Sequence, residues 1–188
     1  QGIVCTQSAT QTLTTPAGLP RYTNGAGVQA WLECQNVLGN AGAKGVGRVI
    51  WSYTNQDGTA GQVSAATLSH IYSQAQINSV ANAATSTYFS NPYLPFSGTD
   101  HGIRSVEEIS LNNGTLTSGV LSLVLGKQLA TLPLPAINVY TERDLILQMA
   151  NLERNYDGHC LTWLWFAPGA VVANTIFNGE LCAIWGEG

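Results

Sequence analysis

At 188 residues the chain is long enough to bury one substantial core, and we expect a single domain. Only 10% of the residues are charged and the net charge is −4, with seven basic residues scattered along the chain, which argues against nucleic acid as a partner. No run approaches ~18 consecutive apolar residues, so we expect a soluble protein without a membrane partner.

Residues 1–20 are predicted to form an N-terminal arm or an edge strand, because a loosely alternating Thr- and Ser-rich stretch leads into a cluster of Pro and Gly. Residues 21–188 then make up the single domain. Its first strand is expected over Val28–Cys34, where every second residue shares one apolar face. Trp31 lies on the opposite face, which indicates a strand covered on both sides.

A hairpin is predicted over Arg48–Ala65. On its first strand, Trp51 and Tyr53 alternate with residues of the other face, a period of two that is typical of a strand. Asp57-Gly58 supplies the reversal, because Asp tolerates the left-handed region and Gly reaches positive φ without a steric penalty. Beyond this turn the chain resumes an extended run.

The middle of the chain gives a mixed signal followed by a second predicted hairpin. Thr67–Tyr88 is expected to be mostly extended or irregular, because Ser, Thr and Asn dilute its apolar pattern. Ile103–Leu111 is predicted to be a strand, Asn112–Gly114 its turn, and Gly119–Leu125 the strand that pairs with it.

The C-terminal third contains the one predicted helix, over Thr141–Met149, which Thr141 can cap at its N-terminus. Two apolar runs bounded by turns, Cys160–Phe166 and Leu181–Trp185, are predicted to be strands buried on both faces. Together the elements predict an all-β fold, an antiparallel β-sandwich of jelly-roll type with one short helix in a connection.

Catalytic signatures are missing from the sequence. It contains no G-x-S-x-G, no H-E-x-x-H and no phosphate-binding G-x-x-x-x-G-K-[ST]. The cysteines lack the C-x-x-C spacing of zinc sites, and Cys34, Cys160 and Cys182 lie in apolar runs that predict buried free thiols. Glu107 and Glu108 are neighbours on a predicted strand, so they are expected on opposite faces and not as a glycosidase pair. We therefore predict no catalytic residue, no metal and no cofactor.

Two histidines keep one enzymatic alternative open. His101 follows Asp100 in a predicted turn, and His159 adjoins Cys160. A site assembled in space around His101 or His159 would make the protein a hydrolase. A turn histidine and a strand-edge histidine are the simpler interpretation.

The aromatic residues divide into two groups. The tryptophans all fall in predicted strands, where packing in the core or between sheets is expected: Trp31, Trp51, Trp163, Trp165 and Trp185. Tyr22, Tyr93 and Phe96 fall in predicted loops and are candidate binding residues at the surface, where an exposed ring can stack on a sugar.

Six segments stand in order across most of the chain: LPRYTNGAGV (Leu19–Val28), YTNQDGTAG (Tyr53–Gly61), GIRSVEEI (Gly102–Ile109), KQLATLPL (Lys127–Leu134), TERDL (Thr141–Leu145) and YDGHCL (Tyr156–Leu161). In this ordered set the chain resembles structural proteins encoded beside the head genes of tailed bacteriophages. The resemblance implies a virion component, a capsid-decorating or minor capsid protein that assembles in the host cytoplasm. It identifies no catalytic or binding residues.

On this basis we expect a non-enzymatic protein that cements a capsid through contacts with the major capsid protein or other virion proteins. We also expect a homo-oligomer, a trimer or another ring. The candidate contact residues lie in the N-terminal arm, since an extended segment can add a strand to a neighbour's sheet: Thr12, Leu13, Thr14, Thr15 and Pro16. An edge strand of its own domain is the other interpretation of the arm. The alternative function is a receptor- or glycan-binding module of a phage fibre, spike or tail.

Overall fold

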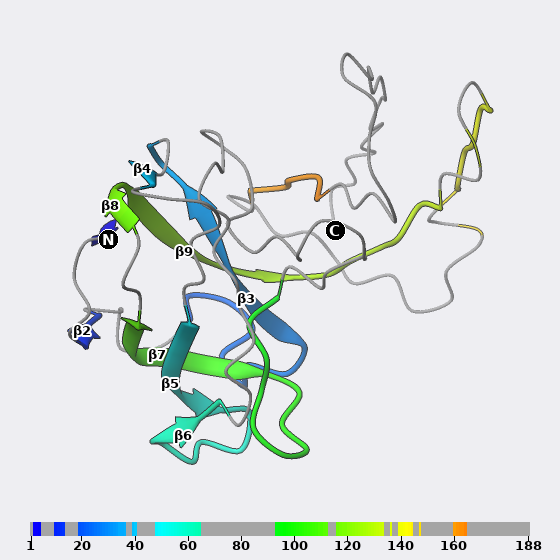
Figure 1. Cartoon of the computed structure of the whole chain (residues 1–188). Coiled ribbons are helices and arrows are strands. Elements are labelled where there is room, and N and C mark those ends of the chain that lie inside the picture. The colour runs from blue at the N-terminus through cyan, green and yellow to red at the C-terminus, as the bar shows by residue number, and fades with distance from the viewer. Residues whose placement is uncertain are drawn as a thin grey trace.

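The computed structural model describes residues 2–4, 10–13, 19–36, 39–40, 48–64, 93–112, 116–133, 136, 139–144, 147 and 160–164. Within these ranges the fold is all-β: every named element is a strand, in two antiparallel sheets and a short two-stranded ribbon, and Leu147 is the one described residue in helical conformation (Figure 1). The prediction of an all-β fold is therefore confirmed for the described part of the chain.

The strands divide between the sheets as follows. The first sheet has the order β1 (Gly2–Val4), β9 (Val120–Lys127) and β3 (Val28–Cys34). The second has the order β2 (Gln11–Thr12), β7 (Ile103–Asn112), β5 (Arg48–Asn55) and β6 (Gln62–Val63). The ribbon pairs β4 (Gly39–Asn40) with β8 (Leu116–Ser118).

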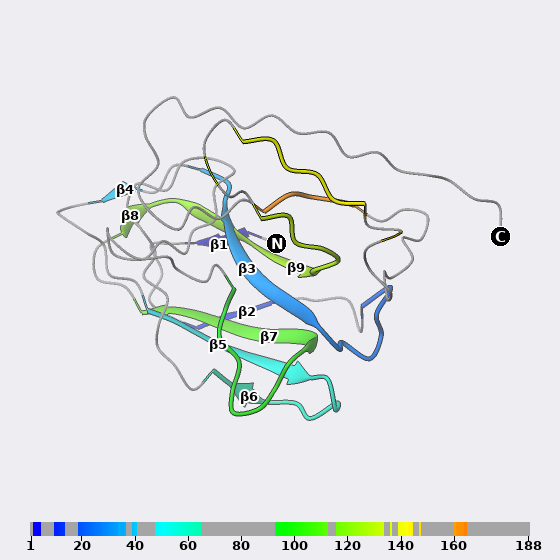
Figure 2. The same cartoon turned by 90° about the vertical axis from the view of Figure 1, so that its right-hand side faces the viewer.

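The core lies between the two sheets, which Figure 2 shows as stacked layers. Both sheets and the segment after residue 92 supply its buried side chains: Ile3, Ala30, Leu32, Cys34, Trp51, Tyr53, Leu94, Ile103, Val106, Ile109 and Leu121. Trp51 and Tyr53 stack with ring centroids 4.4 Å apart, which places two large side chains at its centre. This shared core is what holds the sheets together.

Strand β3 is covered on both faces, as its sequence predicted. Ala30 and Leu32 face the core, and Trp31 on the other face is only 6% exposed. Gly126 on the paired strand β9 makes room for the indole, because a Cβ atom there would lie 2.6 Å from the Trp31 ring. Tyr93 meets the same ring edge-on at 6.1 Å between centroids.

Strand β7 contains two bulges that change its periodicity. Its core-facing residues are Ile103, Val106 and Ile109, spaced by three and not by two. The register against β5 shifts at the corresponding points, between Ser52 and Tyr53 and between Thr54 and Asn55. Each bulge adds one residue on the solvent side of the sheet.

The first of these bulges corrects the prediction that Glu107 and Glu108 face opposite ways. Glu108 lies opposite Ser52 and is exposed, and Glu107 Oε1 accepts hydrogen bonds from Thr54 Oγ1 at 2.5 Å and Ser105 Oγ at 3.2 Å. Both carboxylates therefore lie on the face of the second sheet that points away from the core, where Glu108 is exposed and Glu107 Oε2 is buried without a hydrogen-bond partner among the described residues. The inserted residue breaks the alternation on which the prediction rested.

The predicted pairing of Gly119–Leu125 with Ile103–Leu111 is wrong, although both strands form. β9 pairs with β1 and β3 in the first sheet, whereas β7 pairs with β2 and β5 in the second. Between them the chain passes through β8 and Gly119, whose φ is +129°. The two apolar strands face each other across the core instead of lying side by side, because this buries both of their inner faces.

The first predicted hairpin is present, but its second strand is short. β5 spans Arg48–Asn55, and β6, only Gln62–Val63, pairs with Ser52 and Tyr53. The long partner of β5 is β7, a pairing that the local turn signal does not reveal; its register runs from Arg48 opposite Asn112 to Asn55 opposite Ile103.

After β9 the structure departs from the predicted elements. Of the predicted helix Thr141–Met149, residues 141–144 are not helical whereas Leu147 is, so the short helix is unconfirmed. The carboxylate of Asp144 accepts a hydrogen bond from the N–H of Leu147 at 3.0 Å. Residues 160–164 are not a strand, and Trp163 is 56% exposed instead of packed in a core. Cys160 is likewise an exposed free thiol, whereas Cys34 is buried as predicted.

Several predicted features lie outside the described residues. They are Thr67–Tyr88, the turn around Asn113, the run Leu181–Trp185, and the residues Cys182 and Trp165. Among the helices that the structure does describe, none is long and apolar enough to cross a membrane.

Candidate functional site

The turn after β5 meets the loop of residues 97–101 in the most extensive polar network of the described residues. Asn55 organises the turn: its Oδ1 accepts hydrogen bonds from the N–H groups of Asp57 at 3.1 Å and Thr59 at 2.9 Å. Gly58 adopts a φ of +84°, the left-handed conformation for which the Asp-Gly pair was singled out. The reversal is thus built by Asn55 together with Gly58.

The network continues from the turn into the neighbouring loop through Asp100. Tyr53 Oη donates to Asp100 Oδ2 at 2.7 Å, and Asn55 Nδ2 donates to Asp100 Oδ1 at 2.9 Å. Tyr53 Oη in turn accepts a hydrogen bond from the N–H of Ser97 at 2.7 Å. Both carboxylate oxygens and the hydroxyl therefore have partners within the chain.

The hydroxyl of Tyr53 stays protonated over the whole physiological range. The pKa of Tyr53 is raised to about 12: burial is the largest cause, the N–H of Ser97 opposes it, and the hydrogen bond to Asp100 and its charge add to the rise. A protonated hydroxyl is what the Asp100 carboxylate requires as a donor. The arrangement is a structural lock that fastens the 97–101 loop to β5.

Two further contacts strengthen this lock without creating a reactive group. Arg104 donates through Nε at 3.0 Å and Nη2 at 2.7 Å to the carbonyl oxygen of Gln56, and so holds the turn against β7. The side-chain oxygen of Gln56 accepts a hydrogen bond from the N–H of His101 at 3.2 Å. These charged and polar groups serve the fold of the turn.

The hydrolase alternative built on His101 or His159 gains no supporting contact from the described residues. His101 is exposed, and the carboxylate of its neighbour Asp100 bonds Tyr53 and Asn55. His159 lies outside the described residues. Within the described ranges there is no group of three or more His, Cys, Asp or Glu side chains that could hold a metal ion.

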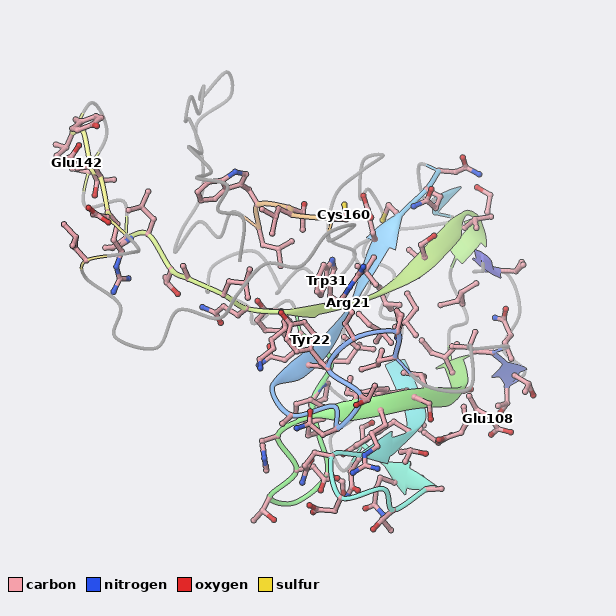
Figure 3. All side chains as sticks on the ribbon, turned by 180° about the vertical axis from the view of Figure 1, so that it is seen from behind. Arg21, Tyr22, Trp31, Glu108, Glu142 and Cys160 are labelled. Atoms are coloured by element: carbon pink, nitrogen blue, oxygen red, sulfur yellow. The ribbon has the colours of Figure 1, made fainter. Side chains whose placement is uncertain are left out.

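The three loop aromatics each engage a different neighbour. Lys127 Nζ lies over the Tyr22 ring, 4.7 Å from its centroid, where β9 ends (Figure 3). Tyr22 also has a positive φ of 54°. Tyr93 packs against Trp31. Phe96 lies against the core, 5.7 Å from the Tyr53 ring centroid. We find no shared aromatic platform among these rings.

Part of the predicted contact segment of the N-terminal arm pairs within its own chain. Thr12 is exposed on β2, opposite Glu108 of β7. Leu13 packs against the core, and its N–H donates to the carbonyl oxygen of Glu107 at 2.8 Å. Thr14, Thr15 and Pro16 lie outside the described residues. The described part of the arm thus contributes edge strands to both sheets.

Most of the exposed large apolar side chains described lie in the segments that follow β9, a feature that the sequence analysis missed. Of the seven exposed large hydrophobic residues described, Val4 and Val63 belong to strands of the sheets, and five come later: Val139, Tyr140, Leu147, Leu161 and Trp163. Tyr140 is 82% and Leu147 84% exposed. The sequence analysis places Leu161 and Trp163 in a buried strand and Leu147 in the predicted helix, and it assigns Val139 and Tyr140 to no element.

The segment that contains Val139 and Tyr140 extends away from the sheets. Figure 1 shows the chain continuing from β9 past the end of the first sheet, and Figure 3 shows Glu142 at the far end of that extension, remote from Glu108 on β7. Arg143 Nη1 reaches back to the carbonyl oxygen of Thr131, which braces the extension.

Comparison with known proteins yields no relative: no protein-family model, no curated protein and no solved structure matches the chain.

Proposed function

We propose that the chain is a non-enzymatic structural protein of a tailed-phage particle, a jelly-roll-like β-sandwich that decorates or cements the capsid through protein–protein contacts. The observation that carries the proposal is the exposure of Tyr140, Leu147 and Trp163 in the segments that follow β9. The resemblance to head-associated phage proteins supplies the identity of the partner, the major capsid protein or another virion protein.

The energetic argument starts from the cost of leaving these side chains in water. Burying one large apolar side chain is worth about 1.5–3 kcal/mol. Exposed apolar residues that cluster in one part of a protein are a feature of interaction sites, and Trp and Tyr are over-represented among the residues that dominate binding energy. Binding a capsid surface would cover Tyr140 and Trp163, and so stabilise the joint between subunits by mass action.

The low charge of the chain is compatible with this role. With 10% charged residues, contact with another protein requires little desolvation of ions. Both carboxylate oxygens of Asp100 accept hydrogen bonds from side chains of the same chain, so this network contributes to the stability of the fold. A cementing protein needs a stable fold and a surface that binds capsid subunits, and it needs no catalytic site.

The test is co-sedimentation of the purified chain with capsids of the virus that encodes it. We expect the unmodified chain to sediment with capsids, and Tyr140→Ser combined with Trp163→Ser to weaken binding by at least about tenfold, or about 1.4 kcal/mol. Val63→Ser is the matched control, since Val63 is 51% exposed but lies on β6. Failure of the unmodified chain to bind capsids or any other virion protein would overturn the proposal.

A glycan- or receptor-binding module remains the alternative, and a glycan array tests it directly. Tyr93 packs on Trp31 and Phe96 packs on the core. These two rings therefore have less free surface for stacking on a sugar than their predicted positions in loops suggested. Specific glycan binding that Tyr22→Ala abolishes would favour the alternative over cementing.

A further inference from the structure

The two strands of the N-terminal arm each occupy an outer edge of a sheet. β1 pairs with β9, with Val4 opposite Val120, and no described strand lies beyond it. β2 pairs with β7, with Thr12 opposite Glu108, at the edge of the other sheet. Figure 1 shows both at the same side of the molecule. One short stretch of chain therefore closes two sheet edges.

The side chain of Gln11 joins these two strands. Its Oε1 accepts a hydrogen bond from the N–H of Val4, and its Nε2 donates to the carbonyl oxygen of Val4, both at 3.0 Å. These are the two bonds that a neighbouring strand would supply to an edge residue. Because Gln11 belongs to β2, the amide clamps β1 to β2, and the arm strands bind the sheets as one unit.

Two apolar side chains anchor this unit. Ile3 is fully buried in the core, and Leu13 packs against it. The pairing itself is limited: β1 has three residues and β2 two, against eight in β9 and ten in β7. Short edge strands with buried anchors are the arrangement seen when a peptide adds a strand to a sheet.

We propose that β1 and β2 exchange between two copies of this chain, each copy's arm strands pairing with β9 and β7 of the other. Every contact made within one chain is available between chains, since donor and acceptor edges have the same sequence in both copies. The six residue steps from Leu13 to Leu19 can span up to about 20 Å, enough to reach an adjacent copy. This inference does not rest on the proposed function.

The test uses the full chain with Val4→Cys and Val120→Cys. Since the N–H and C=O of Val4 turn to Gln11, Val4 and Val120 form a non-hydrogen-bonded pair, whose Cα atoms lie about 4.5 Å apart and suit a disulfide. Isotope-labelled and unlabelled protein are mixed at high concentration, oxidised and digested. Mass spectrometry then identifies which two peptides each disulfide joins. Links that involve the native cysteines are recognised in this way, so these cysteines need not be replaced.

Exchange predicts linked pairs with one labelled and one unlabelled peptide, in the proportion that random mixing gives. Finding only pairs of a single isotope would overturn the proposal. Gln11→Ala is expected to accelerate mixing relative to Thr12→Ala, its exposed neighbour on β2, and equal rates would remove the clamp from the argument. Light scattering on the unmodified chain gives an independent readout: a monomer at every concentration contradicts exchange, and a dimer supports it.

Discussion

The lock between Tyr53 and Asp100 makes a quantitative prediction for Tyr53→Phe. The substitution keeps the ring, and with it the stacking on Trp51, but removes the hydroxyl that donates to Asp100 and accepts from the N–H of Ser97. Hydrogen bonds to charged groups contribute about 1.5–3 kcal/mol. We expect the free energy of unfolding near neutral pH to fall by about that amount.

The same substitution changes the response to alkaline pH. The pKa of Tyr53 in the fold, about 12, lies above its ordinary value of 10.0, so the folded chain holds this proton more tightly than the unfolded chain. The corresponding stability is complete below the unfolded value, and is lost as the pH rises through the folded value. A pKa difference of about two units corresponds to about 2.7 kcal/mol of unfolding free energy, which the unmodified chain loses at alkaline pH. Tyr53→Phe has no hydroxyl to titrate, so its stability lacks this alkaline loss.

Urea unfolding followed by tryptophan fluorescence, at neutral pH and at stepped alkaline pH, measures both effects. Comparing the two chains cancels the contributions of the other tyrosines, including Tyr93, whose pKa burial also raises. Tyr140→Phe is the matched control, since Tyr140 is 82% exposed and its hydroxyl donates to the exposed carboxylate of Glu142. A Tyr53→Phe chain with wild-type stability and an unchanged alkaline slope would refute the structural lock.

Two further predictions concern backbone strain and thiol exposure. Gly25→Ala should cost clearly more stability than Gly61→Ala in urea unfolding: both glycines have φ near +70°, but a Cβ at Gly25 would lie 2.5 Å from the carbonyl oxygen of Ile103, whereas Gly61 faces open space. The strain of φ alone is worth about 1–3 kcal/mol, so equal losses would contradict the close approach. Cys160 should react with a thiol reagent in the native protein, whereas Cys34 should react only after unfolding. Mass spectrometry of the labelled peptides measures this, and labelling of Cys34 before Cys160 would contradict the prediction.

The arm exchange and the cementing proposal use different parts of the molecule. Exchange involves β1 and β2 at the sheet edges, and cementing involves Tyr140 and Trp163 on the segments after β9. Their tests are therefore separable: a chain can exchange its arm without binding capsids, and can bind capsids as a monomer. If both hold, each copy would be linked to a neighbour and to the shell.

Local sequence alone located the principal strands of the described region. The strand Val28–Cys34 matches its prediction, Ile103–Leu111 extends by one residue, and the turn at Asp57-Gly58 has the positive φ that its glycine indicated. These features depend on alternating side chains and on turn chemistry within a few residues, and such forces act before any tertiary contact forms.

Strand partners, and the surfaces they leave open, were decided only by the tertiary structure. β7 and β9 look like a hairpin in sequence, yet they lie in different sheets, because each buries its apolar face against the other across the core. The bulges that place Glu107 and Glu108 on the same face of the second sheet follow from pairing between residues far apart in the chain, and the clamp of Gln11 on Val4 and the exposure of Trp163 are seen only in the folded chain. Local periodicity carries no information about which distant surface a strand will meet.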